Sequence, residues 1–427
     1  MKLKKIFCGI LAASMVMGLM GCGSEEASSE VVSSNPEDVT LSVSIWDTYQ
    51  QPGLQQILDD FTAKTGIKTS LSVMSWNEYW TVLEAGAQGG KLPDVFWMHS
   101  NESQRYMEND MLLDVTEQIA QSSIIDPENY PEDIWGLFTS DDKYYAVPKD
   151  IDTIALWYNK TMFDEAGLEY PNENWTWDDM TEAARKLTKP DGSQYGVGIR
   201  NDGGQMGYYN MIYSNGGYVI SEDKKKSGYD DPKSIEAMKI LETWINEGLM
   251  PSLSTMSETN VEVLMQSAQI AMTIQGSWML ASYEESEYAL ENLDVAELPM
   301  SDSTGERVSM FNGLGWTAAA NGEHPDEAWQ LLEYLGSKEA QEKQAELGIT
   351  MSAYNGTSDK WAQSSVFNLQ AYINMMDNMI INPYSRNTII WDSENNEILK
   401  QVYLGEKTME EVCKEMAAQQ NAVLAEE

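Results

Sequence analysis

Hydrophobic and polar positions follow two alternating periods in the first part of the chain. Apolar side chains at every second position predict a strand over residues 39–45, because successive side chains of a strand point to opposite faces. Residues 54–61 then carry apolar side chains at helical spacing, and Gly66 stands where a glycine ends a helix. Alternation returns over residues 67–73, so a second strand follows the helix.

The same order repeats immediately afterwards. A second helix is predicted over residues 78–88, the Gly- and Pro-containing segment 89–93 breaks it, and residues 94–98 form a short apolar strand. Strand, helix, strand, helix and strand in succession are typical of βαβ units with a parallel sheet covered by helices.

Later segments continue this alternation without an internal repeat or a long linker. Thr176 and Asp179 have the spacing of a capping box at the start of a helix that ends at Leu187. The remaining predicted elements are extended segments at 145–148 and 153–158, a helix from Pro232 to Ile245, a strand at 270–274 and two helices within 327–348. Two tightly joined α/β units, with more than one chain crossing between them, fit this pattern.

The N-terminus has the three parts of an export signal. Lys2, Lys4 and Lys5 precede an apolar run over residues 6–20 that is short for a membrane span, and Cys22 follows Gly21. This arrangement resembles the bacterial lipoprotein signal, which implies cleavage before Cys22 and a lipid on its thiol. An ordinary secretory signal with a chance cysteine is the alternative. We therefore expect a signal peptide at 1–21 and an acidic flexible tether at 22–38.

Composition removes several classes of function. The chain has 27 Lys and Arg residues against 68 Asp and Glu, a formal net charge of −41, which argues against binding to nucleic acid or anionic lipid through charge. Cys8 leaves with the signal and Cys22 carries lipid, so Cys413 has no partner for a disulfide. The chain also contains no phosphate-binding G-x-x-x-x-G-K-[ST] motif and no G-x-S-x-G motif, and its histidines, His99 and His324, are far apart. No metal site and no cofactor are expected.

Tryptophan is unusually frequent. The chain has 14 Trp and 21 Tyr but only 7 Phe residues, although Phe fills a core without a polar atom that needs a partner. Amphipathic rings in such excess suit a ligand that is part apolar and part polar, and sugar rings have this character.

Three aromatic and polar clusters stand at the carboxyl ends of the first three predicted strands. Trp46 and Asp47 follow the first, Trp76 follows the second, and Trp97 and Asn101 end the third. Ligands of open parallel sheets bind beyond the carboxyl ends of the strands, so these clusters are expected to converge on one cleft. Trp175, Trp177, Trp244 and Trp329 instead stand at predicted helix caps or on apolar helix faces, and are expected to be structural.

Several segments resemble family 1 extracellular solute-binding proteins of ABC importers, the group that includes maltose-binding protein. They are 61–67 (FTAKTGI), 90–95 (GKLPDV), 147–160 (VPKDIDTIALWYNK), 276–278 (GSW), 325–329 (PDEAW) and 337–341 (SKEAQ), with similarity over nearly all of residues 39–427. The resemblance implies a two-lobed periplasmic-binding-protein fold of type II, each lobe a mostly parallel sheet flanked by helices. It implies a first lobe of 39–150 and 318–349, a second lobe of 151–317 and 350–427, and hinges near 148–155, 313–318 and 349–353.

The resemblance also implies a set of ligand-binding residues. Stacking candidates are Trp46, Trp76, Trp97, Trp278 and Trp316, and polar candidates are Asp47, Asn101, Asp150, Asp152, Asn312 and Arg386. Ionised carboxylates suit bonding to vicinal sugar hydroxyls. Further roles stay open for some of them: turn formation or helix capping for Asp150 and Asp152, a hinge wedge for Trp316 and a loop salt bridge for Arg386.

The function expected from these observations is capture of a carbohydrate, more consistent with an oligosaccharide than a monosaccharide, by lobe closure. The expected protein is a monomer anchored through Cys22 at the outer face of the cytoplasmic membrane, where it delivers its ligand to an ABC permease, and it is no enzyme. A polyamine receptor and a ferric-iron receptor using Tyr144–Tyr145 or Tyr208–Tyr209 are the alternative binders. Two further functions stay open, that of an anchored carbohydrate hydrolase and that of a chaperone-like or adhesive lipoprotein.

Overall fold

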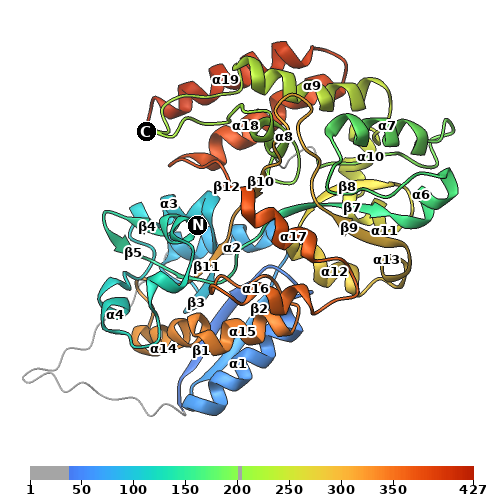
Figure 1. Ribbon diagram of the computed structural model, residues 1–427. Helices are drawn as coiled ribbons and strands as arrows, with labels where there is room; N and C mark the ends of the chain where they lie inside the picture. The colour runs from blue at the N-terminus through green and yellow to red at the C-terminus, as the bar shows by residue number, and fades with distance from the viewer. Residues whose placement is uncertain (1–37, 201–203) are drawn as a thin grey trace, which may run out of the picture. The chain divides into compact units, whose positions relative to one another are not determined.

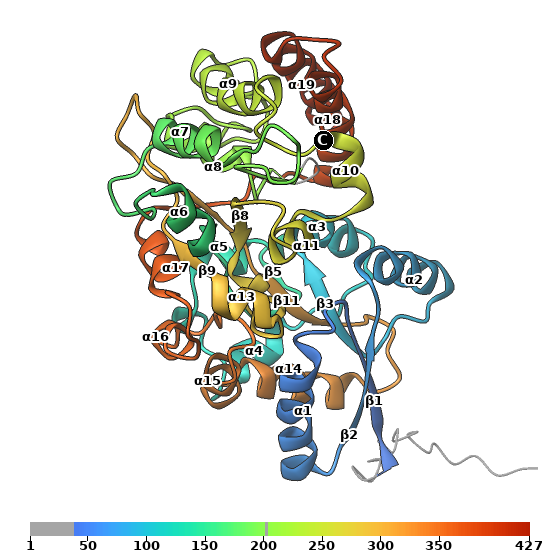
Figure 2. The same cartoon turned by 90° about the vertical axis from the view of Figure 1, so that its right-hand side faces the viewer.

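The computed structural model describes residues 38–200 and 204–427. The predicted signal peptide, Cys22 and residues 22–37 of the predicted tether lie outside this described part. The described residues belong to one compact unit, which is built around two main sheets that Figures 1 and 2 show from two directions.

The first sheet has five strands in the order β2-β1-β3-β11-β6. Its strands are β1 (Thr40–Ile45), β2 (Lys68–Val73), β3 (Val95–His99), β6 (Val147–Pro148) and β11 (Leu314–Ala318). β1 pairs in parallel with β2 and β3, which confirms the βαβ arrangement predicted from the sequence. β11 is antiparallel to both β3 and β6, because it returns to this sheet from the second lobe.

Helices from two separate stretches of the sequence belong to the first lobe together with this sheet. They are α1 (Gln51–Thr65), α2 (Trp76–Gly89), α3 (Ser100–Glu108), α4 (Thr116–Gln121), η2 (Pro127–Asn129), α5 (Glu132–Gly136), α14 (Pro325–Gly336) and α15 (Lys338–Glu346). α1 buries Leu54, Ile57, Leu58 and Phe61 and ends at Gly66, whose φ of 81° is left-handed, as predicted. α1 lies beside α15 at the bottom of Figure 1.

The second sheet has the order β8-β7-β9 and differs from the prediction. β7 (Ile154–Asn159) is antiparallel to both β8 (Met272–Gly276) and β9 (Leu293–Ala296), whereas a mostly parallel sheet was expected in each lobe. All six residues of β7 are buried. An apolar run of this kind identifies a central strand but carries no information about strand direction.

Besides this sheet, the described part of the second lobe is mostly helical and has one small two-stranded ladder, and the first lobe has another. The helices of the second lobe are α6 (Lys160–Ala166), α7 (Trp177–Leu187), α8 (Tyr208–Ser214), α9 (Pro232–Asn246), α10 (Leu253–Glu258), α11 (Val261–Gln266), η3 (Ser277–Met279), α12 (Leu280–Glu284), α13 (Glu287–Asn292), α16 (Ser358–Ala362), α17 (Gln370–Met375), η4 (Met376–Asn378), α18 (Thr388–Tyr403) and α19 (Met409–Leu424). The ladders pair β10 (Ser309–Phe311) with β12 (Met379–Ile381), and β4 (Thr139–Ser140) with β5 (Lys143–Tyr144) in the first lobe. α9, α18 and α19 pack together at the top of Figure 1.

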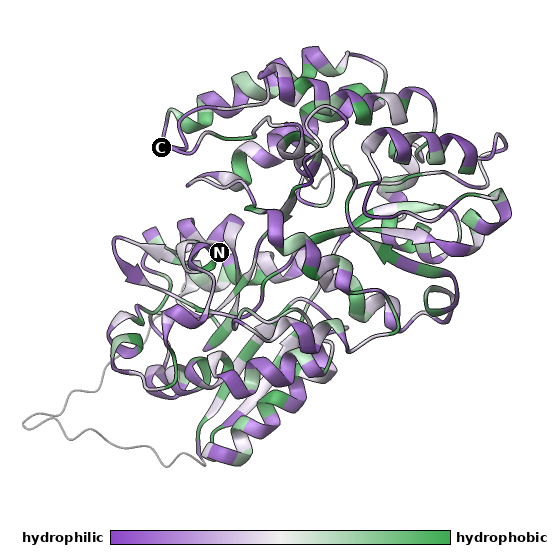
Figure 3. Ribbon diagram, in the orientation of Figure 1, coloured by the Kyte–Doolittle hydropathy of each residue, from purple (hydrophilic) through white to green (hydrophobic). Residues whose placement is uncertain are grey.

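The chain crosses between the two lobes three times, and the three crossing segments lie side by side. Asp150 forms a β-bridge with Ser352, and Asp152 forms one with Asn312. The second crossing therefore lies at residues 312–314, and the boundary predicted between 317 and 318 falls inside β11. Hydrophobic residues concentrate on the strands that lead to these crossings (Figure 3).

Smaller predictions from the sequence also have counterparts in the structure. The capping box of Thr176 and Asp179 is present at the start of α7, and α14 and α15 are separated at Ser337. The strand predicted at 270–274 begins two residues later, as β8, and the helix predicted from Glu78 begins at Trp76. Within the described ranges, no helix has the length and apolarity to cross a membrane.

Two adjacent glycines at the end of α2 allow a matched test of where this helix ends. Gly89 is the last helical residue and Gly90 has a φ of 65°, and an added Cβ meets nothing within 4 Å at either position. We expect Gly90→Ala to destabilise the protein by about 1 kcal/mol through left-handed backbone strain. Gly89→Ala is expected to stabilise it by up to about 1 kcal/mol, since alanine favours the helix. Urea unfolding measures both, and equal effects would contradict the assigned end of the helix.

Candidate functional site

Tryptophan rings from all three parallel strand ends meet in one cluster. Trp46 follows β1, and its ring centroid lies 5.0 Å from that of Trp76 and 4.9 Å from that of Trp97. The same ring lies 4.9 Å from Tyr79 and 5.9 Å from Trp80, both on α2. The convergence expected from the strand ends is therefore present, and we refer to these five residues as the tryptophan cluster.

The cluster has a covered side and an open side. Trp97 and Tyr79 are fully buried, whereas Trp76 is 42% exposed and Trp46 and Trp80 are partly exposed. Trp97 lies in β3, and its ring is covered by Trp46, by Trp316 of β11 and by the ammonium of Lys149. This burial corrects the stacking role expected for Trp97, which supports the cluster, and leaves Trp76, Trp46 and Trp80 as the accessible rings.

Trp316 is a second correction of the same kind. It stands opposite Trp97 in the β3–β11 pairing, the two ring centroids are 5.8 Å apart, and its side chain is 1% exposed. As a core residue of β11, Trp316 presents no ring face to a ligand.

Asp47 shapes the loop beside Trp46. Its Oδ1 accepts hydrogen bonds from the backbone N–H groups of Tyr49, at 2.8 Å, and Gln50, at 3.3 Å. Its Oδ2 accepts from Gln50 Nε2 at 2.9 Å. Both carboxylate oxygens are thus already used to turn the chain into α1, which favours a positioning role over direct ligand binding.

Lys149 and Asp150 form a buried ion pair at the first crossing. The ammonium of Lys149 lies 2.5 Å from Asp150 Oδ2, and both side chains are buried. Lys149 also donates to Gln50 Oε1 at 3.0 Å and lies 4.4 Å from the centroid of the Trp97 ring. Asp150 Oδ1 accepts from the N–H of Leu314 at 2.8 Å, so Asp150 joins two crossings and is already fully engaged.

Asp152 and Asn312 meet between the first and second crossings. Asp152 Oδ1 accepts from the backbone N–H of Asn312 at 3.0 Å and from Gln205 Nε2 at 2.8 Å. Burial raises the pKa of Asp152 well above its usual range, and the nearby Asp150 adds to the increase. Asp152 is therefore favoured as a neutral carboxyl group that links the hinge to the second lobe through Gln205.

His99 stands between the tryptophan cluster and Asn312. Its ring centroid lies 5.4 Å from that of Trp76, and its Nε2 lies 3.4 Å from Asn312 Nδ2. Its Nδ1 accepts from the backbone N–H of Asn101 at 3.2 Å and so caps α3. Burial lowers the pKa of His99 to about 4, so the imidazole is neutral at neutral pH.

Trp278 comes from the second lobe. It lies in η3, directly after β8, and is partly exposed. A Cβ at Gly276 would approach its ring to 2.0 Å, so glycine is required for the ring to lie on this backbone. The N–H of Ser277 donates to the carbonyl of Thr153 at 3.1 Å, which holds Trp278 next to the crossing that contains Asp152.

Arg386 is engaged in an ion pair. Its Nε lies 2.6 Å from Oε2 of Glu108, at the end of α3 in the first lobe, and its side chain is 52% exposed. Its backbone N–H donates to Glu427. This favours the salt-bridge role left open for Arg386, here between the lobes, over contact with a ligand.

Several buried polar atoms around this site have no partner among the described residues. They are Asn101 Oδ1, Asn312 Oδ1, Trp80 Nε1 and Ser277 Oγ. Buried polar groups are almost always hydrogen-bonded to protein, water or ligand. Trp80 belongs to the tryptophan cluster and Ser277 precedes Trp278 in sequence. Asn101 and Asn312 both contact His99, whose ring packs against Trp76. The site therefore offers donors and acceptors near apolar rings.

His99, Lys149, Gln205 and Trp80 are missing from the residues predicted as a binding site. His99 and Trp80 could have been found from their positions, one at the end of β3 and the other one helical turn after Trp76. Lys149 and Gln205 carry no such signal, because their roles depend on contacts with residues far away in the sequence.

The tyrosine pairs considered for iron belong to the packing of the lobes. The hydroxyl of Tyr229 donates to that of Tyr209 at 3.3 Å, which in turn donates to Asp392 Oδ1 at 3.0 Å. Burial raises the pKa of Tyr209 and Tyr229 well above the usual range, which favours neutral phenols, whereas iron binding requires phenolates. Tyr144 and Tyr145 lie far from this group, beside Trp135 and in the core of the first lobe.

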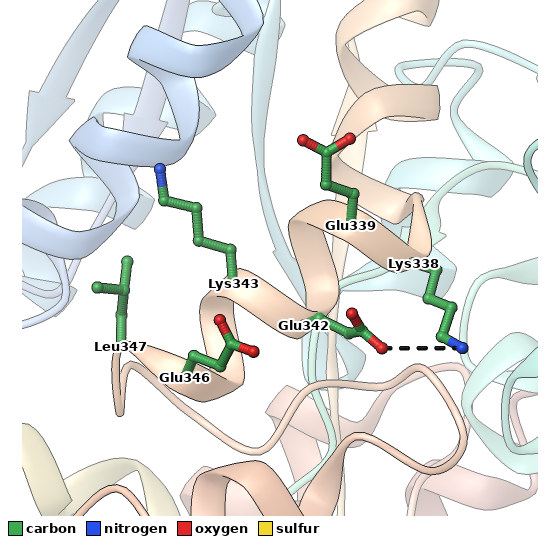
Figure 4. A pocket seen from close by; sticks show the side chains of 6 residues that line it. All are labelled: Lys338, Glu339, Glu342, Lys343, Glu346 and Leu347. Carbon is green, nitrogen blue, oxygen red and sulfur yellow. Dashed lines mark ion pairs between the residues drawn. The ribbon is translucent and has the colours of Figure 1, made fainter.

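A hollow of about 600 Å³ lies on α15, away from the tryptophan cluster. Its lining is mostly charged (Figure 4). Lys338 and Glu342 pair at 3.7 Å, Glu339 pairs with Lys64 at 2.5 Å, and Lys343 pairs with Asp60. These mutually paired side chains form a solvated helix surface and offer no arrangement for a ligand.

Comparison with known proteins gives a consistent result. A family model of bacterial extracellular solute-binding proteins matches residues 47–342. The maltodextrin-binding protein of Bacillus subtilis is 24% identical over 78% of this chain and 77% of its own length. The galactooligosaccharide-binding protein of the same organism is 22% identical over the same shares, 78% and 77%.

Solved structures show the same two-lobed fold. An ABC substrate-binding protein from Listeria monocytogenes, in complex with cycloalternan, has a TM-score of 0.83 at 22% identity and covers 91% of this chain and 99% of its own. Maltose-bound MalE3 from T. maritima has a TM-score of 0.78 at 18% identity and covers 90% of this chain and 100% of its own. These likenesses confirm the predicted fold class.

The buried ion pair at the crossing gives a direct prediction. Lys149→Met leaves Asp150 buried without its counter-charge, and we expect it to lower the free energy of unfolding by about 3–5 kcal/mol. The double variant Lys149→Met, Asp150→Asn removes both charges and keeps an oxygen for the N–H of Leu314. It is expected to recover a large part of the loss in urea unfolding. A double variant as unstable as the single one would contradict this account of the pair.

Proposed function

The chain belongs to the bacterial extracellular solute-binding protein family, and from that premise we propose that it captures a neutral oligosaccharide between its two lobes for an ABC importer. The family is one of binding proteins and not of enzymes, so the hydrolase alternative falls away.

The observation that carries the sugar proposal is the composition of the site. Trp76, Trp46 and Trp80 offer accessible ring surface, and Trp80 has an unpartnered Nε1. Asn101 and Asn312, each with an unpartnered oxygen, contact His99, which packs against Trp76. The C–H faces of a sugar can cover the rings, and its hydroxyl groups can donate to or accept from these atoms. Trp278 supplies a ring from the other lobe, so a ligand that bridges both would favour closure.

The charges of the site support a neutral ligand over a polyamine. Asp47 is bonded to its own loop, Asp150 is paired with Lys149, and the raised pKa of Asp152 favours its neutral form. A polycation needs carboxylates whose charge is available. Of these three carboxylates, only Asp47 keeps its charge without a cationic partner among the described residues, so the site offers little negative charge to a polycation.

The named relatives agree with an oligosaccharide. Maltodextrin- and galactooligosaccharide-binding proteins are among the curated relatives, and cycloalternan and maltose occupy two of the similar structures. Accessible rings from both lobes provide more stacking surface than one sugar unit can cover, which also favours a chain of sugars.

Anchoring completes the proposed function. A lipid on Cys22 would hold the binding protein beside its permease, and the acidic segment 22–38 would provide reach. Confinement at the membrane raises the local concentration of the loaded protein, so that a weak contact with the permease is sufficient.

A thermal-shift screen across mono- and oligosaccharides tests the ligand class. A ligand that binds the native state raises the melting temperature, and at 100 times Kd the stabilisation is about 2.7 kcal/mol. We expect at least one oligosaccharide to raise it clearly, and Trp76→Ala and Trp278→Ala to weaken its binding by about tenfold or more.

Tyr170→Ala is a matched control for these variants. Tyr170 is 37% exposed and contacts Tyr158 and Phe163 in the second lobe, outside the site, so its removal is expected to leave sugar affinity unchanged. If spermidine or ferric citrate shifted the transition and no sugar did, the carbohydrate proposal would be wrong.

The anchor is tested by replacing its thiol. Cys22→Ala removes the site of acylation, and two acyl chains are needed for stable membrane attachment. Expressed at full length in a bacterium, the wild-type protein is expected in the detergent phase of a Triton X-114 partition and the variant in the aqueous phase. Cys413→Ala serves as the control, and aqueous partition of the wild type would exclude the lipid.

A further inference from the structure

His99 joins two parts of the site that are distant in sequence. Its ring packs edge-on against Trp76 at 5.4 Å with an interplanar angle of 86°. On its other side lies the amide of Asn312, in the second crossing between the lobes. A residue in this position can couple the conformation of the tryptophan cluster to that of the hinge.

The bonding of His99 determines which ring nitrogen carries the proton. Nδ1 accepts from the backbone N–H of Asn101 at 3.2 Å, so its lone pair faces that donor. A neutral imidazole has one N–H, and the proton must then be on Nε2. The group that His99 directs at Asn312 is therefore a donor.

The amide of Asn312 must turn its oxygen to this donor. As placed, Asn312 Nδ2 faces His99 Nε2 at 3.4 Å, which sets two donors against each other, while Asn312 Oδ1 is buried without a partner. The two ends of an amide are distinguished only through their hydrogen bonds. Exchanging them gives Nε2–H an acceptor and removes the buried unpaired oxygen.

We propose that His99 is a positioning residue of the binding site, which donates from Nε2–H to the side-chain carbonyl of Asn312 and thereby couples the tryptophan cluster to the hinge. The backbone N–H of Asn312 continues the connection to Asp152, and Asp152 accepts from Gln205 of the second lobe. A ligand that stacks on Trp76 is thereby connected, through the His99 ring, to the crossing about which the lobes close.

Exchanging the two ends of the Asn312 amide also predicts a group that the ligand should present. This part of the inference rests on the proposed function. The Nδ2 amino group of Asn312 takes the buried place of the oxygen, where it needs an acceptor. A sugar hydroxyl or a ring oxygen can accept there, whereas an ammonium group cannot.

Nitrogen-15 NMR of the ligand-free protein tests the tautomer directly. The chain has only 2 histidines, and His324→Gln leaves His99 as the single imidazole. We expect the Nε2–H tautomer, with a proton protected from solvent exchange, and no protonation of the ring down to about pH 5, since burial lowers the pKa of His99 to about 4. An Nδ1–H tautomer, or an imidazolium at pH 7, would overturn the proposal.

A double-mutant cycle tests the coupling. His99→Phe keeps an aromatic ring against Trp76 but removes the donor, and His99→Gln keeps a donor for Asn312. We expect His99→Phe to weaken binding of the best sugar in the panel by about tenfold, and His99→Gln by no more than about threefold. Asn312→Ala alone and the double variant complete the cycle. The double variant is expected to lose clearly less affinity than the product of the two single losses, because residues of one bonded unit are not additive.

Independent, additive effects of the two substitutions would overturn the coupling. The same cycle is measured on the urea midpoint of the ligand-free protein, where non-additivity is again expected. If no sugar binds the wild type, the proposed ligand class fails, while the tautomer and the urea cycle still decide the role of His99.

Discussion

The buried pair of Lys149 and Asp150 is the interaction on which the site most depends. An ammonium and a carboxylate removed from water are each unfavourable alone, so each has to find fixed partners. Lys149 holds the Gln50 side chain and the Trp97 ring, and Asp150 holds the N–H of Leu314. One ion pair therefore sets the loop after β1, the base of the tryptophan cluster and the first two crossings relative to one another, and a hinge that closes on a ligand needs such a fixed centre.

The tryptophan cluster shows how packing and binding share one set of rings. Trp97 and Trp316 are buried in the core of the first lobe and pack against each other, and Trp97 packs against Trp46. Trp46 in turn contacts Trp76 at the open edge. Trp76 also makes edge contacts with Trp80 and His99. These contacts restrict its side chain before a ligand arrives, so less freedom is lost on binding.

Periodicity and turn chemistry predict the fold well but the site only in part. The strands and helices of the first lobe, the glycine after α1 and the capping box of Thr176 depend on neighbouring residues and can be read locally. The direction of β7 relative to its neighbours cannot, because a fully apolar strand packs equally well either way. Likewise, strand-end position brings Trp46, Trp76 and Trp97 together, yet only the pairing of β3 with β11 shows that Trp97 is covered. Lys149 and Gln205 act through partners on other crossings, which no local pattern reveals.

The acidity of the chain and the neutrality of its site are consistent. A net charge of −41 keeps the protein soluble and repels its copies, but an unpaired carboxylate at the binding site would attract cations. Asp150 is matched by Lys149, burial favours the protonated form of Asp152, and Asp47 is bonded to its own loop. Selection then rests on hydrogen-bond geometry and ring stacking, the two interactions that a neutral, hydroxyl-rich ligand can satisfy and a bare ion cannot. With Asp150 paired and Asp152 favoured as neutral, only Asp47 keeps a charge that could attract a cation, and this balance supports the neutral ligand of the proposed function.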